Sequence, residues 1–242
     1  MKRKNEFSSG TYSKVRKGSR STATKKAAQA LLTAAKRKRA YSGAPRVRPE
    51  IKTVDTRVVT QGVISDVPQL WLINATAQGT GTFNRIGTKT TIKSIQFRFS
   101  IEPVGAQAFN DVARMIMVYD KQPNRVLPSF SDIIQSKSNI GAVNSGVDAY
   151  KNIDNTERFQ ILMDQQFYLP GVKIGYDTSF SSNFNGTYSK FMKVRLPVQY
   201  QGTANPPTLS EVNSGAIFIY IWSAIQGGYA MSGDTRVRFY DS

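Results

Sequence analysis

The sequence TTIKSIQFRFSI, residues 90–101, decides the fold class of this chain. From Ile95 onward it alternates, so that Ile95, Phe97, Phe99 and Ile101 share one face and polar residues share the other. A period of two predicts a β-strand with one buried face. Similar runs predict further strands at residues 53–64, 69–74, 112–120, 158–169, 188–200, 215–223 and 235–240.

Turn-forming residues separate these runs and predict loops between them. They occur at Gly79-Thr80-Gly81, Pro123-Asn124, Pro170-Gly171, Asn185-Gly186, Asn205-Pro206-Pro207 and Gly227-Gly228. About eight strands, with one short helical candidate at residues 129–135, predict an all-β fold. We expect a single eight-stranded jelly-roll β sandwich; strand counting leaves an immunoglobulin-like sandwich as the alternative.

The composition excludes several functions. The 242 residues include no Cys and no His, which removes disulfides, thiolate metal sites and the usual general base. We therefore predict no cofactor, no metal site and no catalytic residue. The longest apolar run, residues 215–225, is too short for a membrane-spanning helix of about 20 residues, so we expect no membrane insertion.

Two features that could suggest an enzyme have simpler interpretations. Gly79-Thr80-Gly81 lacks the lysine of a phosphate-binding loop and precedes no helix pattern, which favours a loop between strands. The candidate acids are scattered and have basic neighbours, which indicates a solvated surface. These acids are Asp148, Asp154, Glu157 and Asp164.

Residues 1–48 differ from the rest of the chain in charge. They hold 15 of the 33 Lys and Arg residues and one acid, Glu6, and so carry +14 of the net charge of +17. Such a segment repels itself and has too little apolar surface to fold alone. We predict a basic, mostly disordered N-terminal arm at residues 1–50 and a jelly-roll domain at residues 51–242.

The positive charges of the arm form spaced clusters that can follow a phosphate backbone without reading its sequence. The predicted nucleic-acid-binding residues are Lys2, Arg3, Lys4, Lys14, Arg16, Lys17, Arg20, Lys25, Lys26, Lys36, Arg37, Lys38, Arg39, Arg46 and Arg48.

Within the arm, residues 24–39 are a candidate helix, because Thr24 can cap a run of strong helix formers. A helix induced by nucleic acid or by a partner, and a chain that only fluctuates into helix, explain this run equally well. The clusters at residues 2–4 and 36–39 also have the composition of nuclear import signals, which predicts an import receptor as a partner.

Three patches resemble a known family. They are Arg85-Ile86-Gly87, the segment TIKSI at residues 91–95, and the segment VYDKQPN at residues 118–124. Together they resemble the coat proteins of small circular, replication-initiator-encoding single-stranded DNA viruses, the circovirus and geminivirus-like group. A looser likeness continues in Arg158-Phe159 with Leu162 and Asp164, and in residues 236–240.

The resemblance implies a viral capsid protein, in which a basic arm precedes one jelly roll. It further implies that about sixty copies close into a small icosahedral shell around a circular single-stranded DNA genome. The implied partners are further copies of the chain, the single-stranded DNA genome, a host nuclear import receptor and a host-surface receptor. The implied locations are the virion and, during assembly, the host nucleus.

The chain also departs from the family pattern. Geminivirus coat proteins carry Cys and His thought to hold zinc near the DNA-binding region; this chain has neither, which excludes a zinc-assisted DNA site. Within the VYDKQPN patch we predict that Asp120 and Asn124 form a turn. Arg125 stands where glycine often follows this turn in the family.

Two other functions share some of these features. A coat protein of a small RNA virus or satellite virus would have both the arm and the jelly roll. A cellular nucleic-acid-binding protein would have the basic tail but would not form closed shells. Nuclease sensitivity of the packaged nucleic acid separates the first from a DNA virus, and electron microscopy separates the second.

Overall fold

The computed structural model describes residues 26–27, 29–31, 50–104, 110–135, 146–171, 186–224 and 228–241. The chain divides into two units, Met1–Arg48 and Pro49–Ser242. In the first unit, Lys26, Ala27 and residues 29–31 are helical. The rest of the candidate helix at residues 24–39 lies outside the described residues.

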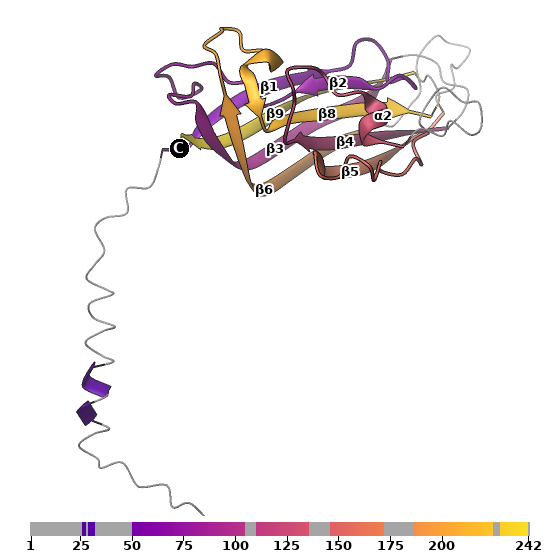
Figure 1. The fold of residues 1–242 in the computed structure, drawn as a ribbon. Helices are drawn as coiled ribbons and strands as arrows, with labels where there is room; N and C mark the ends of the chain where they lie inside the picture. The colour runs from indigo at the N-terminus through magenta and orange to yellow at the C-terminus, as the bar shows by residue number, and fades with distance from the viewer. Residues whose placement is uncertain are drawn as a thin grey trace, which may run out of the picture. The chain divides into compact units, whose positions relative to one another are not determined.

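The second unit is built from two antiparallel sheets (Figure 1). The first sheet has the order β1 (Lys52–Val59), β9 (Tyr229–Asp241), β3 (Lys89–Pro103), β6 (Gly186–Tyr200) and β7 (Val212–Ser214). The second has the order β2 (Gln69–Leu72), β8 (Ala216–Ser223), β4 (Asp111–Asp120) and β5 (Phe159–Leu169). A short helix, α2 (Phe130–Ile133), and a 3-10 turn, η2 (Leu209–Glu211), lie between strands.

The strand pairing identifies the sandwich as a jelly roll. β1 pairs with β9, β2 with β8, β3 with β6 and β4 with β5, so the pairs are nested like a long hairpin rolled up on itself. This is the double Greek-key order of a jelly roll, and it excludes the immunoglobulin-like alternative. The predicted all-β fold is confirmed, with β7 as a three-residue strand added at one edge.

Most predicted strands lie within a few residues of the observed ones. Two predictions are wrong at one end: β9 begins at Tyr229, well before the predicted run at residues 235–240, and the run at residues 53–64 ends too late. β1 stops at Val59. The Thr60 hydroxyl donates to the Gly62 carbonyl at 3.1 Å, and Gly62 has a φ of 76°, a left-handed conformation that glycine adopts readily. The chain therefore turns before Ile64, which packs into the core as a buried loop residue.

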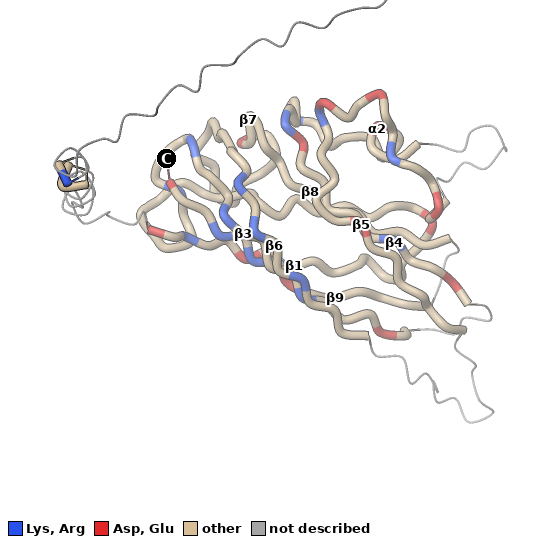
Figure 2. The backbone as a smooth tube through the Cα atoms, turned by 90° about the horizontal axis from the view of Figure 1, so that it is seen from below, with Lys and Arg blue, Asp and Glu red and all other residues tan. Residues whose placement is uncertain are grey.

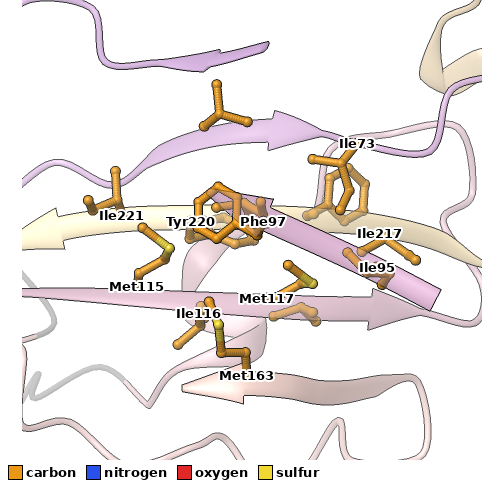
Figure 3. Close-up of a cluster of buried hydrophobic side chains, with 14 of the residues drawn as sticks. Ile73, Ile95, Phe97, Met115, Ile116, Met117, Met163, Ile217, Tyr220 and Ile221 are labelled. Carbon is orange, nitrogen blue, oxygen red and sulfur yellow. The ribbon is translucent and has the colours of Figure 1, made fainter. Parts of the chain in front are cut away.

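The core lies between the two sheets (Figure 3). Met115 and Met117 of β4 lie opposite Ile221 and Ile219 of β8 in the ladder. Phe97 of β3 completes this buried cluster from the first sheet. Every residue of β8 is buried, which explains its continuous apolar sequence AIFIYIWS.

The outer face of the second sheet is buried as well. α2 belongs to the connection between β4 and β5, and its Phe130 ring lies 4.7 Å from the ring of Trp222 and 5.7 Å from that of Tyr220, both on β8. The short helix predicted at residues 129–135 is thereby confirmed, as a cover on this face. No helix among the described residues has the length and apolar character needed to span a membrane.

Candidate nucleic-acid interface

The outer face of the first sheet is charged. Its ladder registers align residues in rows across β1, β9, β3 and β6. The rows are Thr53, Arg238, Ser94 and Lys193; then Asp55, Arg236, Gln96 and Phe191; then Arg57, Asp234, Arg98 and Ser189. With five basic and two acidic side chains, this basic sheet face has a net positive charge, and Figure 2 shows Lys and Arg gathered along these strands.

The acids of the face are set beside arginines. Arg236 donates from Nε and a terminal nitrogen to the two Asp55 carboxylate oxygens, at 2.8 and 2.7 Å. These hydrogen bonds hold the pKa of Asp55 below its ordinary value and raise the pKa of Arg236. Asp234 lies between Arg57 and Arg98 in its row. Among its described residues, the face therefore presents one neutralised pair, Asp55 with Arg236, and an excess of arginine and lysine.

Aromatic rings lie among these cations. The side chain of Phe191 is 51% exposed although phenylalanine is usually buried. The Lys93 ammonium lies 5.2 Å from the centre of the Tyr240 ring, a cation–π distance. Unpaired bases stack on exposed rings, and phosphates pair with cations, so this combination suits a single-stranded polynucleotide.

Two hollows mark the same face. One of about 450 Å³ is lined by Thr91, Ile92, Lys93, Val194, Arg195, Tyr240 and Asp241. The other, of about 270 Å³, is lined by Asp55, Gln96, Arg98, Asp234, Thr235 and Arg236. Both combine charged groups with carbon surface and are open to solvent, as a site for a flexible chain requires.

Of the three motif patches, residues 91–95 belong to β3 and this face, whereas Arg85 and Asp120 lie elsewhere and hold loops in place. Arg85 is 1% exposed. Its guanidinium donates to the carbonyls of Thr76 at 3.2 Å, Gly87 at 2.8 Å and Gly202. The central guanidinium carbon, Cζ, lies 4.7 Å from the centre of the Tyr200 ring. Arg85 thus ties residues 76–87 to the segment that follows β6.

Asp120 is fully buried at the end of β4 and accepts a two-point hydrogen bond from Arg158, at 3.0 and 2.9 Å. It also accepts from the Gln122 backbone at 2.9 Å, and Asn124 has a φ of 48°. The predicted turn at Asp120 and Asn124 is confirmed. Arg125, with a φ of 59°, occupies a left-handed conformation, which explains why glycine suits this position.

A second ion pair involves Asp164, which is exposed and has a basic neighbour, as expected. Arg114 donates to both of its carboxylate oxygens, at 2.8 and 2.5 Å. Arg114 also donates to the carbonyls of Val147 and Ala149, at 3.0 and 2.6 Å, and lies over Trp222. The pair pins the β4–β5 connection to the outer face of the second sheet. In the part of the chain that the structure describes, no group of three acids is placed to hold a metal ion.

Of the predicted arm residues, Lys26 is described, and it is helical and exposed. The other predicted cations, between Lys2 and Lys25 and between Lys36 and Arg48, lie outside the described residues. Sequence reasoning missed the basic sheet face. The signal was present in TRVRF, residues 235–239, where Arg236 and Arg238 occupy the polar positions of an alternating strand.

Jelly rolls of this order occur in viral capsid proteins, lectins and cupins. The jelly roll of this chain, with a net positive sheet face and the exposed ring of Phe191, fits the capsid class among these. The chain belongs to the Geminivirus coat protein/nuclear export factor BR1 family, whose model matches residues 2–242. The resemblance to coat proteins of single-stranded DNA viruses is confirmed, and with it the expectation that the chain is not an enzyme.

Two solved structures are similar to the chain. A structure of desmodium yellow mottle tymovirus has a TM-score of 0.31 and 7% sequence identity, over 80% of this chain and 89% of that chain. A structure of infectious bursal disease virus, Gx strain, has a TM-score of 0.23 and 11% identity, over 80% of this chain and 32% of that chain. No curated protein matches the sequence.

Proposed function

We propose that this coat protein assembles into a small icosahedral shell of about sixty copies and packages a circular single-stranded DNA genome. The family match over residues 2–242 supports a role in the virion. The observation that carries DNA binding by the folded domain is the basic sheet face, where cations of four strands lie in register and the ring of Phe191 is exposed beside them.

In this proposal the arm supplies most of the charge. Each arm brings +14, so about sixty copies concentrate on the order of 800 positive charges, enough to neutralise a similar number of phosphates through counterion release. Binding through the arm is insensitive to base sequence and weakens steeply with salt. The basic sheet face adds a fixed surface on which unpaired bases and phosphates find partners.

The clusters at residues 2–4 and 36–39 serve in the same proposal as nuclear import signals read by a host receptor. The exposed loops of the jelly roll are the surface available to a host-surface receptor.

Deletion of residues 1–48 tests the role of the arm. We expect particles of the truncated protein, imaged by electron microscopy, to contain far less nuclease-protected DNA than particles of the full chain. Packaging at the full-length level would exclude the arm as the main DNA-binding element. Packaged nucleic acid that ribonuclease digests after the particle is opened, while deoxyribonuclease leaves it intact, would instead favour an RNA virus coat protein.

A further inference from the structure

The edges of the two sheets are not alike. An edge strand exposes unpaired N–H and C=O groups, and proteins usually protect it with charges, proline or short length. β1 carries Asp55 and Arg57, and β2 has four residues. β6, which β7 covers only at its end, carries Lys190, Lys193, Arg195 and Pro197. These three edges are protected against pairing with another chain.

β5 lacks these protections. Its sequence FQILMDQQFYL extends over 11 residues and contains no Lys, no Arg and no Pro. Its single charge, Asp164, is neutralised by Arg114. Among the described residues, its hydrogen-bonded neighbour in the sheet is β4 alone, and Figure 1 shows β5 at the border of the sheet. A long, uncharged edge of this kind is a template for a further strand.

We propose that β5 is the edge through which two copies of this chain pair, β5 against β5, around a two-fold axis. The inference rests on the proposed self-assembly, which requires contacts between copies. A two-fold axis perpendicular to the sheet reverses the direction of the second strand, so the pairing is antiparallel and the contact is self-complementary. It joins two four-stranded sheets into one continuous sheet across the interface.

The side chains of β5 fit this role. Gln160, Gln166 and Tyr168 are exposed, with 58% of Tyr168 accessible. Amide and aromatic side chains pair across antiparallel strands without charge repulsion. The β6 edge is the natural contrast, since pairing two copies there would bring lysines against lysines.

The absence of Cys from the chain allows a direct test. Single cysteines are introduced along β5 in the full chain: Gln160→Cys, Leu162→Cys, Gln165→Cys, Gln166→Cys and Tyr168→Cys. In a two-fold antiparallel pair, the residue nearest the axis faces the same residue of the other copy. Their Cα atoms are about 4.5–5.5 Å apart, a separation that a disulfide can bridge. We expect a disulfide-linked dimer at one position, with yields that fall on either side of it. The matched controls on β6, Thr187→Cys and Ser189→Cys, should stay unlinked.

Electron microscopy of the unsubstituted protein separates the two proposals. If particles form but no β5 cysteine gives more dimer than the β6 controls, the β5 pairing is wrong and shell assembly stands. If a β5 cysteine links copies but no particles form, the pairing stands and the shell is wrong.

A pair of charge variants gives a second readout. Gln166→Lys with Tyr168→Lys places like charges on both sides of the proposed contact, and sedimentation should show at least a tenfold weaker association. Thr187→Lys with Gln199→Lys, at exposed β6 positions outside the rows of the basic sheet face, is the control and should associate like the parent. Equal effects of the two pairs would overturn the proposal.

Discussion

The two outer faces of the sandwich use arginine in opposite ways. At the second sheet, Arg114 of β4 and Arg158, the last residue of the β4–β5 connection, are paired with Asp164 and Asp120. On the first sheet, Arg57 and Arg98 are exposed. An arginine that is paired with a carboxylate at a loop fixes that loop, whereas an exposed one is available to an anionic partner. Position in the fold, more than residue type, separates structural from binding charges.

The covering of each face explains the difference. The second sheet carries Tyr220 and Trp222 outward, which need apolar cover, and the connection with α2 supplies it. Polar backbone groups of that connection then need partners in a water-poor layer, and arginine supplies several donors at once. The first sheet has polar and charged outward residues and needs no cover. It can therefore serve as a binding surface without rearrangement.

The largest expected effect comes from breaking a buried pair. Asp120→Ala removes the acceptor of Arg158 and of the Gln122 backbone. Loss of one partner of a buried ion pair costs about 3–5 kcal/mol. Urea unfolding should show a loss of that size. Asp55→Ala, at the exposed pair, is the control and should unfold close to the parent. Equal stability of the two variants would contradict the division between the faces.

Arg85→Lys is expected to have a smaller effect on stability. A single ammonium cannot reach the carbonyls of Thr76, Gly87 and Gly202 in the geometry of a guanidinium, so at least one buried carbonyl loses its donor. We expect a loss of about 2 kcal/mol in the free energy of unfolding. Lys121→Ala on the exposed loop after β4 is the control. Urea unfolding measures this loss. An unchanged midpoint of urea unfolding for Arg85→Lys would show that Arg85 does not anchor these loops.

The sequence predicted the strands well because alternation is a local property. The run from Ile95 to Ile101 and the closing strand near residues 235–240 are visible without knowing what they pair with. The nested strand order was not visible, since β1 pairs with β9 from the opposite end of the domain. Only this long-range pairing distinguishes a jelly roll from another sandwich.

The functional residues show the same limit. Arg85 and Arg158 were noticed as parts of motifs, but an arginine in a loop gives no local sign that it will be buried. The basic sheet face combines residues from four strands, and its rows exist only after β3 has been placed between β9 and β6. The basic arm stays a prediction from charge alone, which needs no knowledge of partners within the chain.

Neutralising the basic sheet face should weaken DNA binding without affecting stability. For Arg98→Gln with Arg238→Gln, we expect the slope of log affinity against log salt for single-stranded DNA to fall by about 1.4, since each phosphate contact contributes about 0.7. Titrations of the full chain at several salt concentrations measure this. Arg125→Gln with Lys151→Gln, away from the face, is the matched control. An equal fall in slope for the control pair would mean that only net charge matters.

The smallest expected effect is at Asp55, whose pKa in the folded chain is lowered by hydrogen bonds from Arg236. A carboxyl group with a lowered pKa stabilises the fold above its ordinary value of 3.8, and this contribution is lost as the pH falls through the lowered pKa. The difference in melting temperature between the parent and Asp55→Asn should therefore be small near pH 6 and should shrink as the pH falls below 3.8. At neutral pH the same variant releases Arg236 and should bind single-stranded DNA slightly more tightly. If the difference in melting temperature stays constant across this pH range, the substitution acts through packing and not through the charge of Asp55.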